Sequence, residues 1–427
     1  MRILVVTGSP WREDNNVGNS YSNLFANMNG VEFANLYLKS GYPDNKVANR
    51  YFQITEKGII QNIFNKNMPS GHVVDLKNHP CSFSTKENNL YNKLRIARWQ
   101  VLFWFRELIW KFGRWKSPEL KDFLSNFQPD IIFAPLQGSL YLNNVLLFIS
   151  AYTNKPLVTY AWDDIYTLKQ MSFSPLFWID RLIKRSKIKK VANLSSHLYV
   201  ISNLQKYEYE KAFRKECKVL FKGYKFEFSK VSTKRRRTPL KLLYTGNISS
   251  GRWKTLAKIG EVLDKINSSD DVAQLFIYTQ TPISTKMRRA LNKTNLFLMG
   301  SVSHEEVGAL QENSDILVHV ESFNLKEMLA TRLSFSTKLV DYFYKNKCIL
   351  AVGNELSASI DYLKKNDAAV VVTNYKNLNE ELNKVISNPS IVEKYAKKAW
   401  DCGKRNHQIA EIQKKLYQEL SSLVEED

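Results

Sequence analysis

The sequence predicts an α/β protein built from two Rossmann-like domains that face each other across a cleft. One observation is the apolar run Ile3–Val6, which ends at a glycine-bearing loop and precedes a helix start with a serine cap. Another is that this pattern restarts at Leu240–Tyr244, where a second apolar run leads into a second glycine-bearing loop and a helix. Strand and helix patterns alternate after both starts. A cleft between two such domains is the default position for a ligand site.

Composition places the domain boundaries. Residues 230–239, KVSTKRRRTP, are basic and polar and end in proline, which predicts a linker between a first domain over 1–229 and a second over 240–395. Residues 396–427 have helical periodicity and no strand signal, so we expect a C-terminal helix that packs back toward the first domain. The further buried strands are predicted at 130–134, 156–160, 197–201, 274–279, 296–299, 316–320, 348–352 and 368–372.

Charge and cysteine content limit the class of protein. The formal net charge of +21 favours an anionic partner, which could be nucleic acid, an acidic membrane surface or a phosphorylated ligand. No helix-turn-helix, RNA-binding sheet signature or zinc finger is visible, so specific nucleic-acid binding is not expected. The four cysteines form no CxxC pair, which argues against zinc and against a disulfide framework. With no signal-peptide pattern at the start and no spanning-length apolar stretch, we expect a cytoplasmic protein.

The stretch 244–254, YTGNISSGRWK, predicts a site for a diphosphate. Its loop contains Gly246 and Asn247, and glycine allows the backbone to approach a ligand closely. The helix that follows offers free N–H groups and positive potential at its start. Arg252 can bind a phosphate through two hydrogen bonds, and Lys254 can act as a point charge. The alternative is a glycine-containing turn with two solvated cations.

The stretch 334–341, SFSTKLVD, predicts a second part of the same site. Ser336 and Thr337 are typical helix-cap residues, whereas Lys338 in the first helical turn opposes the helix dipole. A bound anion would offset that unfavourable placement. Asp341 lies one turn further along on nearly the same face, where a carboxylate could accept hydrogen bonds from ribose hydroxyls. The alternative is an ordinary capped helix with an internal ion pair.

Several segments, in this order, resemble the C-terminal half of retaining GT-B glycosyltransferases of the family-four type: YTGNISSGRWKTL, GSVSHEEV, SDILVHVESF, RLSFSTKLVDYF and NKCILAVG. The resemblance extends to MRILVVTGSPW…VGNSYSNLF at the start and SHLYVISNLQKYEYEKAF in the middle. It therefore covers most of the chain. It implies a GT-B fold with an acceptor-binding first domain and a second domain that binds a nucleotide sugar.

The resemblance also implies roles for individual residues. In that family an Arg and a Lys after the first strand of the second domain hold the donor diphosphate, and Arg252 and Lys254 are the matching pair. The family has two glutamates with seven residues between them. The second matches Asp341, and the first matches Leu333, which departs from the pattern; Glu321 or Glu327 could replace the missing carboxylate. The other donor-binding positions implied are Gly18, Gly246, Asn247, Val302, Arg332, Ser336, Thr337 and Lys338.

The activity implied is transfer of a sugar, with retention of configuration, from a nucleotide-diphosphate donor to a saccharide or a polyprenyl-diphosphate-linked saccharide, in bacterial capsule, exopolysaccharide or O-antigen-type synthesis. Fixed cations would stabilise the leaving nucleoside diphosphate, so no metal and no cofactor are expected. Asp163 and Asp164, after the strand 156–160, could hold acceptor hydroxyls or assist proton transfer, could bind a metal, or could cap a helix. The alternatives are a non-catalytic nucleotide-sugar-binding protein, which Leu333 makes conceivable, and a basic nucleic-acid-binding protein.

Two basic segments rich in aromatic residues, 93–116 and 177–190, predict amphipathic helices of the kind that lie in a membrane interface. An anionic surface attracts each nearby cation by about 1 kcal/mol. We therefore expect peripheral contact with the inner face of the cell membrane. The alternative is that the apolar faces pack inside the first domain.

Overall fold

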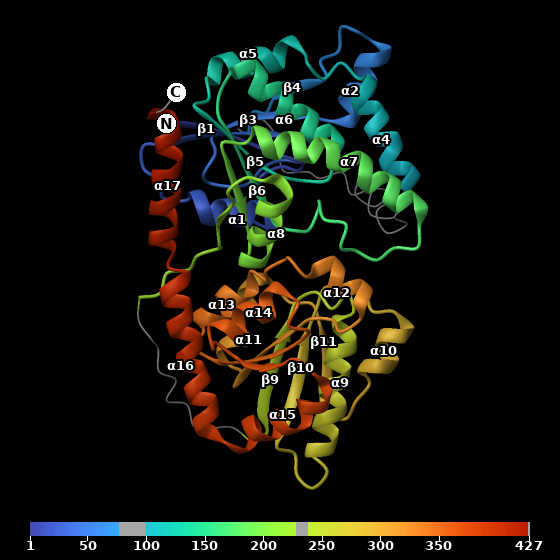
Figure 1. Ribbon diagram of the computed structural model, residues 1–427, viewed down its shortest axis with the longest axis vertical. Coiled ribbons are helices and arrows are strands. Elements are labelled where there is room, and N and C mark those ends of the chain that lie inside the picture. Colours follow the sequence, from blue (N-terminus) through green and yellow to red (C-terminus); the bar gives the residue numbers. More distant parts are fainter. Residues whose placement is uncertain (77–99, 228–237, 426–427) are drawn as a thin grey trace.

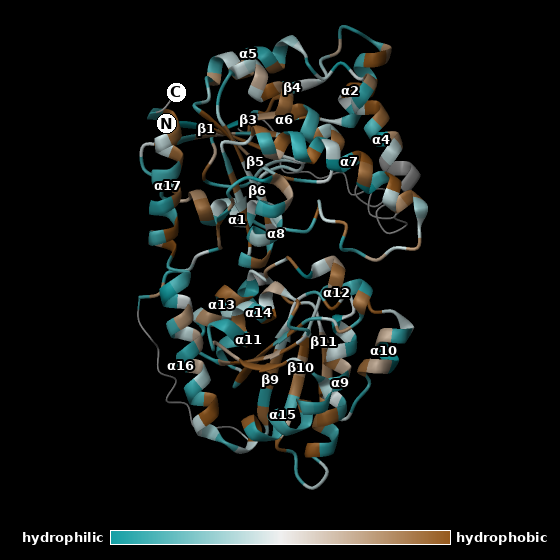
Figure 2. Cartoon of the chain, viewed as in Figure 1, coloured by the Kyte–Doolittle hydropathy of each residue, from teal (hydrophilic) through white to brown (hydrophobic). Residues whose placement is uncertain are grey.

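The computed structural model describes residues 1–76, 100–227 and 238–425. It contains two mainly parallel sheets, one in each half of the chain, with helices on their faces (Figure 1). Hydrophobic residues are concentrated in the strands of both sheets (Figure 2). The predicted α/β class with two Rossmann-like domains is confirmed.

The first sheet has eight strands in the order β4-β3-β2-β1-β5-β6-β7-β8, parallel except for β4, which runs antiparallel to β3. The strands are β1 (Arg2–Thr7), β2 (Glu32–Tyr37), β3 (Arg50–Ile54), β4 (Gly71–Val73), β5 (Ile131–Pro135), β6 (Leu157–Ala161), β7 (His197–Val200) and β8 (Lys218–Val219). The helices are α1 (Asn16–Phe25), α2 (Glu56–Phe64), α4 (Gln100–Phe112), α5 (Pro118–Phe127), α6 (Leu140–Thr153), α7 (Pro175–Leu194) and α8 (Asn203–Phe213). The strand order reverses between β1 and β5, the type of switch point where doubly wound sheets bind ligands.

The second sheet has six parallel strands in the order β11-β10-β9-β12-β13-β14, with its switch point between β9 and β12. The strands are β9 (Leu240–Thr245), β10 (Ala273–Tyr278), β11 (Leu296–Gly300), β12 (Ile316–Val320), β13 (Cys348–Val352) and β14 (Val370–Val372). The helices are α9 (Arg252–Ile266), α10 (Thr285–Leu291), α11 (His304–Glu312), α12 (Leu325–Thr331), α13 (Lys338–Tyr344), α14 (Ala358–Lys365) and α15 (Leu378–Ser387). Every strand predicted in this half is present, because strands buried on both faces are continuous apolar runs.

Two helices at the end of the chain join the domains. α16 (Pro389–Asn406) packs on α13 and β13 of the second domain, so the boundary predicted at residue 395 falls inside a helix. α17 (Ile409–Glu425) contacts α1 and β5 of the first domain. All but the last two residues of the predicted linker 230–239 lie outside the described residues. Among the described residues, no helix is both long enough and apolar enough to cross a membrane.

Candidate active site

A polar pocket of about 640 Å³ lies at the carboxyl edge of the second sheet. It is formed by the loops that follow β9, β10, β11 and β12 and by the start of α13. The first domain touches the pocket wall, since Ser334 donates a hydrogen bond of 2.6 Å to the Asp163 carboxylate. The lining residues include Thr245, Gly246, Asn247, Arg252, Tyr278 to Pro282, Ser301, Val302, His319, Val320, Glu321 and Ser334 to Lys338.

Arg252 and Glu321 form a bidentate ion pair in this pocket. The Glu321 carboxylate accepts two hydrogen bonds of 3.1 Å from the Arg252 guanidinium, and Glu321 is 5% exposed. Burial is the largest single effect and would lower the pKa of Arg252, but the charge and hydrogen bonds of Glu321, together with Tyr244 and Asp163, outweigh it and raise that pKa. Asp163 in the first domain acts on Arg252 in the same direction. The guanidinium is therefore a fixed charge, held in one orientation by a paired carboxylate.

Lys338 supplies a second cation to the same pocket. Its ammonium donates a 2.7 Å hydrogen bond to the carbonyl of Thr245 and lies 4.6 Å from the centre of the Tyr244 ring. Burial and the charge of Arg252 lower the pKa of Lys338 to about 8. A Cβ atom at Gly246, whose φ is 129°, would lie 2.4 Å from the Lys338 ammonium nitrogen. Only glycine at position 246 therefore leaves room for this cation.

His319 is a polar group of the pocket that the sequence did not indicate. It lies inside the apolar strand β12, is 3% exposed, and its Nε2 is 3.6 Å from a carboxylate oxygen of Glu321. Burial lowers the pKa of His319 well below its usual value, so the ring is neutral. Among the described residues Nε2 has no hydrogen-bond partner. A bound ligand can supply one.

The structure corrects the predicted position of the second cation. Lys254 is exposed, does not line the pocket, and its ammonium lies 5.5 Å from the centre of the Trp253 ring. Two residues along a helix turn its side chain by about 200° relative to Arg252. The cation that accompanies Arg252 in the pocket is Lys338.

The structure also moves two predicted donor ligands to the contact between the domains. Asp341 does not line the pocket, and its carboxylate pairs with Lys222 at 2.8 Å. Arg332 is 6% exposed and pairs with Glu208 of the first domain at 2.9 Å. Each side chain pairs with an opposite charge of the first domain and neither lines the pocket, so both connect the domains.

Leu333, at the position expected to hold a glutamate, has a structural explanation. It is fully buried and packs within the apolar cluster of the first domain. Its carbonyl accepts a 2.8 Å hydrogen bond from Ser202. A carboxylate there would be buried among apolar side chains at a large desolvation cost. The carboxylate in the pocket is Glu321; Glu327 does not line it.

The adjacent residues Asp163 and Asp164 have separate surroundings. Asp163 is exposed and does not itself line the pocket; its backbone carbonyl accepts hydrogen bonds from Gln205 and Tyr209. The Asp164 side chain is fully buried, accepts hydrogen bonds from the backbone N–H groups of Tyr166 and Thr167, and pairs with Arg181 at 3.2 Å. Asp164 closes a turn, whereas the Asp163 carboxylate contacts the pocket wall at Ser334.

The remaining predicted positions divide between the two domains. Gly246, Asn247, Val302, Ser336 and Thr337 line the pocket with Arg252, Glu321 and Lys338. The Ser336 N–H donates a 2.9 Å hydrogen bond to the Ser359 hydroxyl, so this backbone amide is not available to a ligand. Gly18 does not line the pocket: it lies in the first turn of α1, and its N–H donates to the Asn15 side chain at 2.7 Å.

Sequence comparison identifies no relative: no family model matches the chain, and no curated protein matches it. Comparison of structures finds proteins with a similar fold. HepE of Anabaena in complex with UDP is 12% identical and covers 99% of this chain and 100% of its own, with a TM-score of 0.63. Sucrose-phosphate synthase of Thermosynechococcus elongatus is 11% identical and covers 100% of both chains, with a TM-score of 0.64. These likenesses over the whole chain confirm the predicted GT-B fold.

Proposed function

We propose that the protein is a glycosyltransferase that moves a hexosyl group from a nucleotide-diphosphate sugar to a saccharide acceptor. The observation that carries this proposal is that two cations, Arg252 and Lys338, line one pocket at the carboxyl edge of a Rossmann-like sheet. Expulsion of a nucleoside diphosphate builds negative charge on the leaving group, and fixed cations stabilise that charge without reorganising. The similar structure of HepE was solved with UDP and with UDP-glucose, which also supports a nucleotide-sugar donor.

In the proposed reaction the bond from the anomeric carbon to the diphosphate breaks, and a bond to an acceptor hydroxyl oxygen forms. The acceptor proton passes to a phosphate oxygen of the donor, so no further base is needed. Arg252 and Lys338 hold the diphosphate, and the loop that contains Ser301 and Val302 adjoins the nucleobase. Asp163 approaches from the first domain, where it could orient an acceptor hydroxyl. Retention of configuration is part of the proposal, and its support is the sequence resemblance. The anomeric coupling constant of the product shows whether the configuration is retained.

The acceptor belongs to the finer part of the proposal. We propose a saccharide or a polyprenyl-diphosphate-linked saccharide of a bacterial surface polysaccharide, elongated at the cytoplasmic face of the membrane without a metal or another cofactor. The support for the acceptor class is the sequence resemblance. A lipid-linked acceptor would require the enzyme to reach a membrane surface.

Three helices of the first domain support membrane contact, because each presents an apolar face to solvent. The exposed side chains are Ile60, Ile63 and Phe64 of α2, Phe105, Leu108 and Phe112 of α4, and Leu176, Ile179, Leu182 and Ile183 of α7. Single exposed apolar residues are normal, but aligned faces on neighbouring helices mark interaction sites. The alternative that these faces pack inside the domain is wrong for these side chains. Trp110 and Trp115 do pack inside the domain, where they are 2% and 6% exposed. Residues 93–99 of the predicted segment lie outside the described residues.

A thermal-shift screen of UDP-, GDP-, dTDP- and CMP-sugars tests the proposed function. We expect one nucleoside-diphosphate sugar to raise the Tm, because a ligand that binds only the native state stabilises it, by about 2.7 kcal/mol at 100 times its Kd. The same donor should then be hydrolysed or transferred. A shift without any turnover would support the non-catalytic binding alternative, and no shift with any donor would contradict both.

Donor affinity should depend on pH through Lys338. Its pKa of about 8 means that the ammonium is charged below pH 8 and loses its charge as the pH rises above that value. The diphosphate of a nucleotide sugar is a diester and does not titrate in this range. We therefore expect the Kd of the donor to rise roughly tenfold between pH 7 and pH 9. Isothermal titration at several pH values checks this, and a flat profile would contradict a role for the Lys338 charge.

A further inference from the structure

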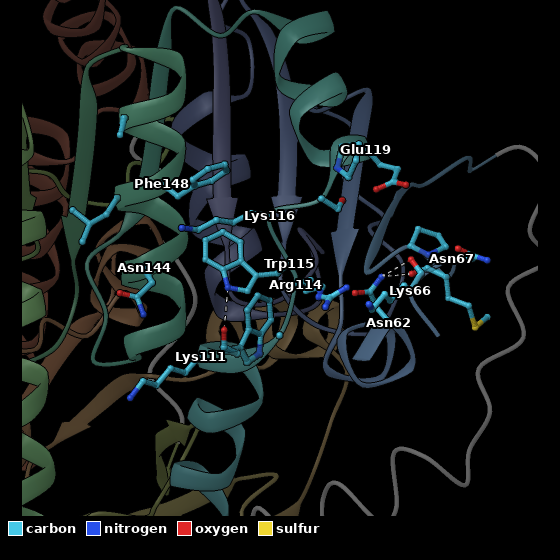
Figure 3. A pocket seen from close by; sticks show the side chains of 18 of the residues that line it. Asn62, Lys66, Asn67, Lys111, Arg114, Trp115, Lys116, Glu119, Asn144 and Phe148 are labelled. Carbon is cyan, nitrogen blue, oxygen red and sulfur yellow. Dashed lines mark hydrogen bonds between the residues drawn. The ribbon is translucent and has the colours of Figure 1, made fainter. Parts of the chain in front are cut away.

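A second cavity, of about 990 Å³, lies in the first domain and shares no lining residue with the proposed active site (Figure 3). It is bounded by the end of α2 and the loop after it, by the loop between α4 and α5, and by α6 and α7. We call it the basic groove. Its lining residues include the cations Lys66, Lys111, Arg114, Lys116 and Lys187 and the carboxylate Glu119.

The charge of the basic groove is unbalanced. Five cations face one carboxylate, and in the described part of the chain none of the five forms an ion pair. Some cations elsewhere in this protein do pair, as Lys169 does with Glu208 at 2.6 Å. A concave surface with one sign of charge concentrates the opposite ion. The occupant of the groove is therefore anionic.

The loop between α4 and α5, which carries Arg114 and Lys116, is held in place before any ligand binds. Ser70 donates a 3.0 Å hydrogen bond to the carbonyl of Arg114, and the Trp115 indole donates a 3.0 Å hydrogen bond to the carbonyl of Trp110. The Lys116 ammonium lies 5.1 Å from the centre of the Phe148 ring. A Cβ atom at Gly113 would lie 2.0 Å from a methyl carbon of Ile59, so the loop crosses α2 too closely for another residue. Preorganised charges lose less entropy when a ligand binds.

Exposed apolar side chains at the rim of the groove favour a lipid over a soluble polyanion as its ligand. Phe64 and Phe112 lie next to groove segments and are 87% and 71% exposed, and Met68 of the lining is 42% exposed. Nucleic-acid bases can stack on phenylalanine rings, but the exposed faces of α2 and α4 also carry the aliphatic side chains Ile60, Ile63 and Leu108, on which bases do not stack. A phospholipid has an acyl region directly beside its phosphate and can contact both kinds of side chain. We infer that the basic groove binds the phosphate-bearing headgroup of an anionic phospholipid, while Phe64, Met68 and Phe112 contact the acyl chains.

This inference adds a headgroup site to the membrane contact proposed above and does not depend on transferase activity. It predicts that a few defined cations, rather than the net charge of +21, set the affinity for anionic membranes. Each cation near an anionic surface contributes about fivefold in affinity, so three removed together should cost on the order of 100-fold.

The test measures binding of the full chain to vesicles of phosphatidylcholine containing one third phosphatidylglycerol. The groove variant is Lys111→Gln, Arg114→Gln and Lys116→Gln in one chain, which keeps long polar side chains at exposed positions. The matched control is Lys394→Gln, Lys397→Gln and Lys404→Gln on α16, which removes the same charge from exposed positions on the side of the molecule opposite α4 and α7 (Figure 1). A third variant, Phe64→Ser with Phe112→Ser, tests the rim.

We expect the groove variant to lose on the order of 100-fold in affinity, the rim variant about tenfold or more, and the control less than threefold. Equal losses in the groove variant and the control would overturn the inference, because they would show a diffuse charge effect. A second measurement is the Tm in millimolar inorganic phosphate. If phosphate raised the Tm of the wild type but not of the groove variant, and both bound vesicles equally, the groove would be a site for a soluble anion. The lipid assignment would then be wrong. The donor-induced Tm shift should be the same in all variants, which separates this test from that of the transferase proposal.

Discussion

Replacement of Lys338 by methionine is expected to lower kcat by about 100- to 1000-fold, the effect of removing one preorganised group that stabilises developing charge. Methionine keeps the length of the side chain and removes its charge. Because the ammonium is partly buried beside the like charge of Arg252, its removal should leave the stability unchanged or slightly higher. The measurement is steady-state transfer with the donor identified by the thermal-shift screen, together with the Tm of each variant.

Lys254→Met is the matched control, because it makes the same chemical change at an exposed lysine outside the pocket. We expect its kcat to remain within twofold of the wild type. The Lys338→Met variant should also lose the rise in donor Kd between pH 7 and pH 9. A large defect in Lys254→Met with little effect in Lys338→Met would show that the diphosphate binds on the other side of α9.

Replacement of Arg252 by methionine is expected to lower kcat by a similar factor and also to destabilise the protein. The reason for the second effect is Glu321, which is 5% exposed and would be left as an unpaired carboxylate. Removing one partner of a buried ion pair costs about 3 to 5 kcal/mol. Because the Arg252 side chain is 22% exposed, we expect a loss near the lower end, about 3 kcal/mol, measured by chemical denaturation.

The double variant Arg252→Met, Glu321→Gln separates binding from folding. Removing the unpaired carboxylate should restore most of the lost stability, whereas activity should stay low because the cation is still absent. Residues in direct contact show coupling of this kind in double-variant cycles. Full transfer activity in the double variant would contradict a role for Arg252 in catalysis. A single variant as stable as the wild type would contradict the importance of the ion pair.

Four strands of the first sheet, β2, β3, β4 and β8, were not predicted from the sequence. β2 was missed because Asn35 interrupts its apolar pattern. In the structure Asn35 is fully buried and its side chain donates hydrogen bonds to the carbonyl of Val5 at 2.9 Å and to Thr7 at 3.0 Å, so neighbouring β1 satisfies it. His319 was missed because its burial and its closeness to Glu321 are properties of the folded pocket. A single sequence shows the polar residue but not what satisfies it.

Some residues of the candidate site were predicted correctly and others were not, because the face of the helix on which a side chain lies decides whether it reaches the pocket. A glycine-bearing loop before a helix indicated an anion site, and Arg252 at the start of that helix lines the pocket. Lys254 had the same charge and nearly the same position in the sequence, but it lies on another face of α9. Lys338 was recognised as unusual because a cation stood in the first turn of a helix. Its contact with the Gly246 loop, 92 residues earlier in the chain, could not be read from its neighbours.

The sequence by itself determined the strands of the second sheet and four of the eight strands of the first (β1, β5, β6 and β7), because buried parallel strands must be continuous apolar runs that end in polar loops. It also determined which loops could bind an anion, because glycine and helix starts have local conformational requirements. Only the tertiary structure decided which charges serve a ligand and which serve the domain contact. Asp341 and Arg332 pair with Lys222 and Glu208, more than 100 positions away, and Leu333 packs into the other domain. Such pairs form only where two folded domains contact each other, and no local sequence pattern specifies that contact.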